Sequence, residues 1–118
     1  MMGLAEDLKR NQVSLVDQMV PYMVVGSPSS ESELRQFIGG FVHLMAEAAG
    51  GNLLPREDYL NTVIPAIKKA GMTLTVTMKG MVDVSMLCAA FLDRAHLTWV
   101  RQFCLAYTEE LLRVWDNS

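Results

Sequence analysis

Residues 72–78 read MTLTVTM, and this segment separates an all-α protein from one that contains a sheet. Strict alternation of apolar and polar residues is typical of a β-strand. A strand needs a partner, however, and no second alternating run of similar length occurs in the sequence. Thr73 is equally suited to cap a helix whose apolar face would comprise Leu74, Met78, Met81, Val82, Ser85 and Ala89. We therefore predict a helix here and an all-α fold.

Working outward from this segment, four further stretches have the apolar spacing of helices, namely residues 4–20, 31–48, 55–70 and 94–115. Ser30 and Glu33 form a capping box at the start of the second stretch. The expected boundaries are a loop over residues 21–30, Gly50-Gly51-Asn52, Gly71 and a weaker break at Asp93-Arg94. The sequence thus predicts about five helices around one core.

Glycine and proline residues predict irregular packing inside two of these helices. Gly39 and Gly40 each cost about 1 kcal/mol relative to alanine in mid-helix, so we expect another helix to approach closely there. Pro55 suits the first turn of the third helix. Pro65 removes a backbone donor and is expected to kink the same helix.

Composition restricts the class of protein. The chain has 118 residues, which suits one domain over residues 1–118, and its net charge is −3. This mild acidity argues against nucleic acid or an anionic membrane as a partner. The N-terminus is acidic where a signal peptide would be basic, and the longest strongly apolar run, residues 84–92, is too short to span a bilayer. We therefore expect a cytoplasmic protein, with Cys88 and Cys104 as buried free thiols.

Few residues suit catalysis or metal binding. His43 and His96 are the two histidines, and no spacing pairs either with a nucleophile or a metal-ligand set. His43 lies in mid-helix between apolar residues, where a histidine usually has a structural role. The N-terminal charged residues, Asp7 among them, are expected to form a solvated turn. We expect no enzymatic activity, and an enzyme site around His43 is the weaker alternative.

The order of motifs over residues 59–118 is the most informative part of the sequence. One helix ends in basic residues and Gly71, the segment Met72-Thr73-Leu74 begins a long apolar helix, and the last helix contains Phe103, Tyr107 and Trp115. This order resembles the N-terminal sensory domain of RsbR-type stressosome proteins, and residues 31–52 match it loosely. The resemblance implies a globin-like fold without haem, a downstream STAS domain and a partner-switching kinase.

This resemblance implies a sensory and regulatory domain that passes a stress signal through its last helix to the STAS domain. The sequence ends soon after an apolar helix, without a glycine cap after Trp115, so we expect the N-terminal part of a longer protein. The alternative is a free-standing helical adaptor, because nine methionines could provide an adaptable surface for a partner helix. Core filling is the simpler explanation of these methionines.

The resemblance also allows a test for haem. A globin haem needs a proximal ligand, normally a histidine, on the helix that precedes Gly71. Residues 55–70 contain neither histidine nor cysteine, and Tyr59 is the only conceivable ligand there. His43 belongs to the preceding helix, on what would be the distal side. We therefore expect no haem and no other cofactor.

A small apolar ligand, if one binds, is expected between the second, third and fourth helices, where Pro65 and the two glycines disturb the packing. The predicted lining is Phe41, Met45, Ile64, Met78 and Met81. A solid core without a cavity is an equally good expectation.

A homodimer is expected because 51% of the residues are hydrophobic and several apolar side chains remain after one core face is assigned. These residues are Val84, Met86, Leu87, Leu92, Leu105 and Leu112. The last helix has the longest apolar stripe, and Leu111, Val114 and Trp115 are expected to extend beyond the core. We therefore predict that these three residues contact a second copy and provide the output.

Overall fold

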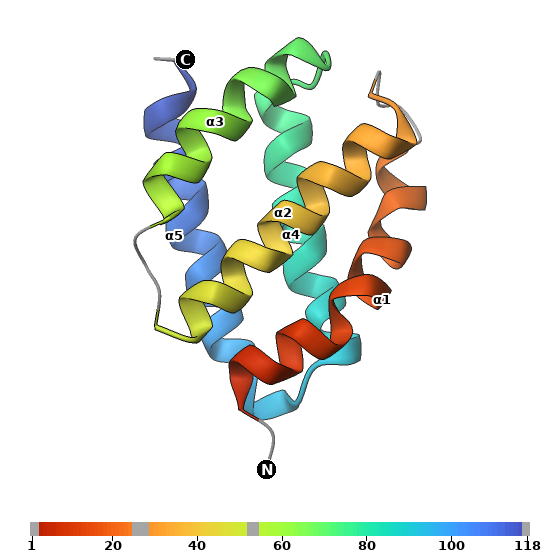
Figure 1. Ribbon diagram of the computed structural model, residues 1–118, viewed down its shortest axis with the longest axis vertical. Helices are drawn as coiled ribbons and strands as arrows, with labels where there is room; N and C mark the ends of the chain where they lie inside the picture. The colour runs from red at the N-terminus through yellow and green to blue at the C-terminus, as the bar shows by residue number, and fades with distance from the viewer. Residues whose placement is uncertain (1–2, 25–28, 52–54, 117–118) are drawn as a thin grey trace.

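The computed structural model describes residues 3–24, 29–51 and 55–116, which form five α-helices and one 3₁₀ turn (Figure 1). Within these described ranges there is no strand. The prediction of an all-α bundle of about five helices is confirmed. The elements are α1 (Leu4–Val24), α2 (Glu31–Ala49), α3 (Pro55–Lys69), α4 (Leu74–Phe91), η1 (Arg94–His96) and α5 (Leu97–Trp115).

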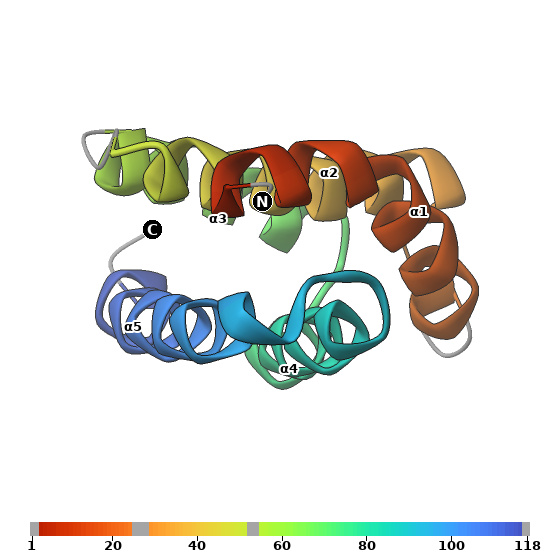
Figure 2. The same cartoon turned by 90° about the horizontal axis from the view of Figure 1, so that it is seen from below.

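The helices lie in two layers, with α1, α2 and α3 in one and α4 and α5 in the other (Figure 2). The pair formed by α1 and α2 has the most extensive contact, and α4 packs against both α1 and α5. The molecule measures 41 × 29 × 18 Å along its principal axes. Each layer turns its apolar stripes toward the other, so a single core forms between them.

Side-chain caps begin α2 and α4 where the sequence predicts them. The capping box is confirmed, because Ser30 Oγ accepts from the Glu33 amide at 3.1 Å and Glu33 Oε1 accepts from the Ser30 amide at 2.9 Å. Thr73 Oγ1 accepts from the Val76 amide at 3.2 Å. Residues 72–78 therefore begin a helix, as predicted, and their alternation does not indicate a strand.

The ends of α1, α2 and α3 agree only in part with the prediction. Gly51 (φ 98°) and Gly71 (φ 87°) adopt left-handed backbone after α2 and α3, as helix-ending glycines do. Asn52 and residues 25–28 lie outside the described residues. The predicted loop over residues 21–30 is wrong at its start, because α1 continues through Pro21 to Val24. Burial of the preceding residues, Met19 and Val20, offsets the cost of a helical proline.

The predicted apolar face of α4 is only partly right, because Met81 is buried and Leu74 and Met78 pack against the core while other predicted residues face outward. Its buried residues are Thr77, Gly80, Met81, Val84 and Cys88, whereas Val82 is 56% exposed and Ala89 is also exposed. The reason is that α4 is apolar on nearly every side, so its periodicity indicates no unique buried face. Val84 and Leu92, which we expected on a dimer surface, are buried in the core.

Close packing occurs at one of the two central glycines of α2. A Cβ atom added at Gly40 would lie 2.8 Å from Tyr59 Oη of α3, whereas one at Gly39 would meet only Val16 Cγ2, at 3.9 Å. Gly40 thus provides the space that the Tyr59 ring occupies. The expected close approach of another helix is therefore that of α3. The helix α3 itself is continuous through Pro65.

Candidate functional site

An apolar pocket of about 50 Å³ is lined by residues of both helix layers. Residues from all five helices contribute to it, and the only lining residue outside a helix follows Gly71. The lining comprises Met23, Phe37, Ile38, Phe41, Tyr59, Ile67, Met72, Thr77, Gly80, Met81, Val84 and Tyr107. An occupant of this pocket would therefore contact every helix of the bundle.

The pocket has a partly exposed rim and a buried interior. Met23, Phe37 and Tyr59 are half-buried and form the rim, while the other lining residues are buried. Tyr59 Oη donates to the Phe37 carbonyl oxygen at 3.4 Å, which joins α3 to α2 beside the opening. In the interior, the Tyr107 ring lies 4.8 Å from the Phe41 ring, edge to face. Aromatic rings thus define much of the pocket shape.

The electrostatics of the pocket disfavour charge. Burial raises the pKa of Tyr59, and burial also raises the pKa of Tyr107 well above its ordinary value. Both side chains therefore stay neutral at physiological pH. None of the lining residues, all of which the structure describes, is acidic or basic. A charged group in the pocket would consequently lack a partner and pay a large desolvation cost.

Two of the five predicted lining residues, Phe41 and Met81, line the pocket. Met45 and Ile64 are fully buried elsewhere in the core, and Met78 is half-buried outside the pocket. Sequence reasoning missed the rim and Gly80, whose missing side chain provides space within the pocket. A glycine in the middle of an apolar helix was the available signal, since such a glycine usually has a packing or functional reason.

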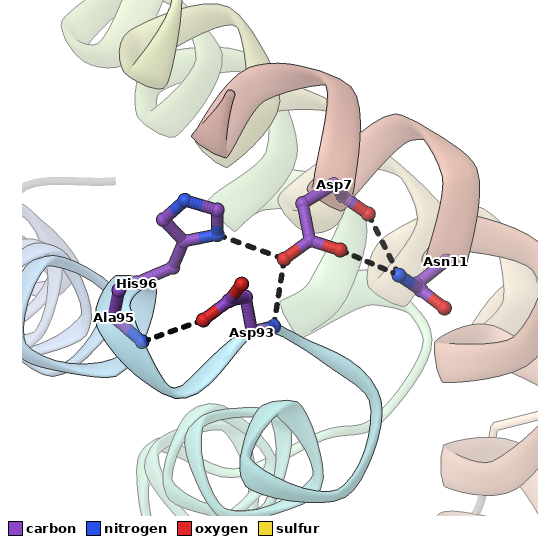
Figure 3. Close-up of polar contacts among 5 residues, drawn as sticks. All are labelled: Asp7, Asn11, Asp93, Ala95 and His96. Atoms are coloured by element: carbon purple, nitrogen blue, oxygen red, sulfur yellow. Dashed lines mark hydrogen bonds and ion pairs between the residues drawn. The ribbon is translucent and has the colours of Figure 1, made fainter. Parts of the chain in front are cut away.

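A second feature is a polar cluster at one end of the bundle, which we call the Asp7 cluster: Asp7, Asn11, Asp93 and His96 (Figure 3). Asp7 Oδ2 accepts from the Asp93 amide and contacts His96 Nδ1, both at 2.8 Å. Asp7 Oδ1 accepts from Asn11 Nδ2 at 3.0 Å. A carboxylate oxygen only accepts, so His96 donates through Nδ1. The cluster fastens α1 to the turn between α4 and α5.

The prediction that Asp7 lies in a solvated turn is therefore wrong, because its side chain is only 9% exposed. The acidic side chain is tolerated in the core because three hydrogen bonds from neighbouring groups replace its water. A weak signal for this burial existed in the sequence, since Asp7 follows Leu4 by about one helical turn and lies beside the apolar stripe. The partners Asp93 and His96 could not be found, because they come from a distant part of the sequence.

His43 lies outside both the apolar pocket and the Asp7 cluster. The weaker alternative, an enzyme site, was centred on this residue. Its side chain is 64% exposed, and Nε2 lies 3.9 Å from Glu47 Oε1, one turn along α2. The structure places His43 on the surface of α2, where its contact with Glu47 lies within one helix. Among the described residues, no group of three or more His, Cys, Asp or Glu side chains could hold a metal ion.

Cys88 of α4 and Cys104 of α5 are buried free thiols, as predicted. Burial raises the pKa of Cys88 to about 12, with smaller contributions from Cys104 and Asp7. Burial also raises the pKa of Cys104 to about 11. Because the thiolate is the reactive form, neither side chain has the environment of a nucleophile or redox centre.

The end of the last helix was expected to extend beyond the core, and this expectation is wrong for Leu111, which is 1% exposed. Val114 and Trp115 are half-buried and pack against the core. The reason is that the end of α3 covers this part of α5: Lys68 Nζ donates to the Trp115 carbonyl oxygen and lies 5.1 Å from the centre of its ring. Leu111 is therefore not available to a second copy.

The predicted long apolar helix is present as α4, and its apolar part extends well beyond residues 84–92, the run that by itself is too short to span a bilayer. Its 18 residues have a mean hydropathy of 1.4, so by length and composition alone this helix could cross a membrane. The core helix of a soluble bundle passes the same test. Only 28% of these residues are buried within the bundle, which leaves much apolar surface on the outer side.

No protein-family model, no curated protein and no solved structure matches this chain. The resemblance to RsbR-type sensory domains thus rests on the motifs of residues 59–118.

Proposed function

We propose that this chain is a non-enzymatic sensory domain, globin-like in fold and without haem, of a stressosome-type scaffold. In this proposal it passes a stress signal through α5 to a STAS domain and a partner-switching kinase, in the cytoplasm. The observation that supports it most is the place of Tyr107, which lines the pocket and belongs to the C-terminal helix.

The path from pocket to output is short. Tyr107 lies between the rings of Phe41, at 4.8 Å, and Tyr59, at 6.4 Å, so an occupant that moves either ring also moves Tyr107. Trp115 follows Tyr107 by about two helical turns, or about 12 Å. A rigid helix transmits such a displacement to its end, where a following domain would be attached.

The contact at the end of α5 has the features of an element that responds to such a displacement. Lys68 of α3 holds the Trp115 backbone and covers its ring, through one hydrogen bond and one cation–π contact. Both interactions are individually weak at a partly exposed site. A small movement of α5 against α3 would therefore change how the chain leaves the bundle.

The absence of catalysis in this proposal is supported by the surroundings of both histidines. His43 is exposed beside Glu47 alone among the described acidic residues, and His96 donates to Asp7 from a nearly buried position. A general base needs access to a substrate proton, which the nearly buried His96 lacks, and His43, although exposed, does not line the pocket that could hold a substrate.

The proposal includes a homodimer, with no nucleic-acid or membrane partner. Four large apolar side chains are exposed on the layer formed by α4 and α5: Val82, Met86, Leu105 and Leu112. Met86 and Leu105 are 69% and 63% exposed, more than any other leucine or methionine described as exposed. A second copy is the simplest partner that would cover them.

The same exposed surface favours the alternative, a free-standing adaptor that binds a partner helix around Met86. The reading frame beyond codon 118 distinguishes the two functions. An in-frame STAS-domain sequence supports the sensory domain, whereas a stop codon at this point contradicts it and favours the adaptor.

A further inference from the structure

We propose that the pocket between the two layers binds a small, uncharged, apolar molecule of about the size of xenon or propane. This inference rests on the proposed sensory function, because it names the class of ligand that the sensor would detect. Size, chemistry and the adaptability of the lining each support it.

The size of the pocket limits the ligand. A single water needs about 10–15 Å³ of such space, and an engineered cavity of about 150 Å³ binds benzene or xenon. The present pocket, at about 50 Å³, lies between these values. It therefore admits a molecule of a few heavy atoms and is much smaller than the roughly 300–1,000 Å³ of drug-sized sites.

The chemistry of the lining disfavours both water and ions. A buried water needs two to four polar partners, and the only polar side-chain groups of the lining are the hydroxyls of Tyr59, Thr77 and Tyr107, two of which already donate their hydrogen elsewhere. Thr77 Oγ1 donates to the Thr73 carbonyl oxygen at 2.8 Å, and Tyr59 Oη donates to the Phe37 carbonyl oxygen. An ion would find no opposite charge on any lining residue.

Met23 at the rim provides a means of entry. A Cβ atom at Gly80 would lie 2.8 Å from Met23 Cε and 3.2 Å from its Sδ, so the tip of Met23 lies directly against the α4 backbone. Methionine is unbranched and flexible, and it is half-buried here. Rotation of this side chain would open the pocket without moving a helix.

Xenon under pressure is a suitable probe, read by the chemical shifts of ¹³C-labelled methionine methyl groups. Met23, Met72 and Met81 line the pocket, so their signals should shift with xenon pressure and saturate. Met45 is fully buried away from the pocket and Met86 is 69% exposed, so both are controls within the same spectrum. Equal shifts in all five residues, or none in the three pocket residues, would overturn the proposal.

A pair of glycine variants tests the location. Gly80→Ala places a methyl group against Met23 and takes space from the pocket, so the xenon affinity should fall about fivefold or more. Gly39→Ala makes the same change in the middle of α2, away from the pocket, and should leave the affinity unchanged. Unchanged affinity in a folded Gly80→Ala protein would overturn the proposal.

Acetate, a small anion, tests whether the ligand must be uncharged. Saturable shifts of the pocket methyl groups with acetate would overturn the proposal that the ligand is uncharged, and the absence of such shifts supports it.

The indole signal of Trp115 tests the proposed output through α5 independently of ligand binding. If xenon binding also shifts the Trp115 indole signal, both this inference and the proposed sensory function are supported. If xenon shifts the pocket methyl groups and leaves Trp115 unchanged, the ligand class stands while the sensory output through α5 is contradicted.

Discussion

Asp7 joins two parts of the chain that are 86 residues apart in sequence, through the hydrogen bond from the Asp93 amide. Local patterns predict local structure, which explains why the Ser30 capping box was found and the Asp7 cluster was not. The only trace of the cluster in the sequence is an acidic residue beside the apolar stripe of α1. His96 is 89 residues from Asp7, and nothing in the sequence around it indicates this partner.

Replacing Asp7 with alanine should lower the free energy of unfolding by about 3 kcal/mol. The Asp93 amide and His96 Nδ1 would each lose a carboxylate acceptor in a largely buried site. Urea unfolding followed by circular dichroism measures this loss. Asp17→Ala is the matched control on α1: its ion pair with Arg35 is about half exposed, so the cost should stay below about 1 kcal/mol. Equal losses would contradict a structural role of the cluster.

The two buried thiols predict how stability depends on alkaline pH. Burial raises the pKa of Cys88 and Cys104 above the ordinary value of 9.0, so the folded state holds both protons more tightly than the unfolded state. Stability is therefore complete below pH 9 and falls as the pH rises through the folded values of about 11 and 12. By pH 10 the loss should be about 1 kcal/mol per thiol.

Urea unfolding at pH 8 and pH 10 measures this difference. In the Cys88→Ala Cys104→Ala variant, the difference between the two pH values should shrink, whatever the variant costs in absolute stability. A variant with the same pH dependence as the parent would show that other groups cause the loss.

At the scale of single helices, α2 shows how two adjacent glycines can have different roles. A Cβ atom at Gly39 would meet Val16 Cγ2 of α1 at an ordinary contact distance, whereas one at Gly40 would overlap the Tyr59 side chain of α3. The sequence predicted that a helix would approach this pair and could not indicate which glycine it would contact. Only the packing of α3 distinguishes them.

Gly39→Ala should raise the free energy of unfolding by about 0.5–1 kcal/mol, because alanine favours helix and meets no obstacle. Gly40→Ala should lower it by about 1 kcal/mol, because the new methyl group overlaps Tyr59 Oη and the gain in helix propensity is smaller than this cost. Thermal unfolding of both variants measures the two signs. If both stabilise the protein, the contact between Tyr59 and Gly40 is not rigid.

The helix α5 contains a second pair of neighbours with opposite surroundings. Leu111 is 1% exposed and Leu112 is 46% exposed. Leu111→Ala should therefore cost about 2–5 kcal/mol, whereas Leu112→Ala should cost less than about 1 kcal/mol. Chemical unfolding of the two variants checks the buried face of α5. Similar costs would mean that the end of α5 is turned differently against α3.

At the scale of the whole molecule, the number of helices could be predicted while the orientation of α4 could not. Periodicity indicates a buried face only when the opposite face is polar. Leu8 and Leu15 of α1 are buried as the spacing predicted, but α4 combines a mean hydropathy of 1.4 with only 28% burial. For the same reason the predicted pocket lining was only partly right. The pocket depends on which side of α4 faces the core.

The apolar outer surface of α4 and α5 predicts that the protein is a dimer, as the hydrophobic composition of the sequence already suggested. Met86 and Leu105 lie eight and nine residues from opposite ends of the turn Arg94–His96, so the hairpin brings them to a similar height. Exposed apolar patches of this kind usually mark an interface. Sedimentation at tens of micromolar should therefore show a species of twice the 13.1 kDa chain mass.

The variant Met86→Glu Leu105→Glu should sediment as a single chain, because a two-fold axis would bring like charges together in an apolar interface. Both positions are exposed, so the thermal midpoint of the monomer should change little. Val13→Glu is the matched control, since Val13 is 71% exposed on α1 in the opposite layer and should leave the dimer intact. If the parent protein sediments at 13.1 kDa, or if Val13→Glu alone dissociates it, the α4–α5 layer is not the dimer surface.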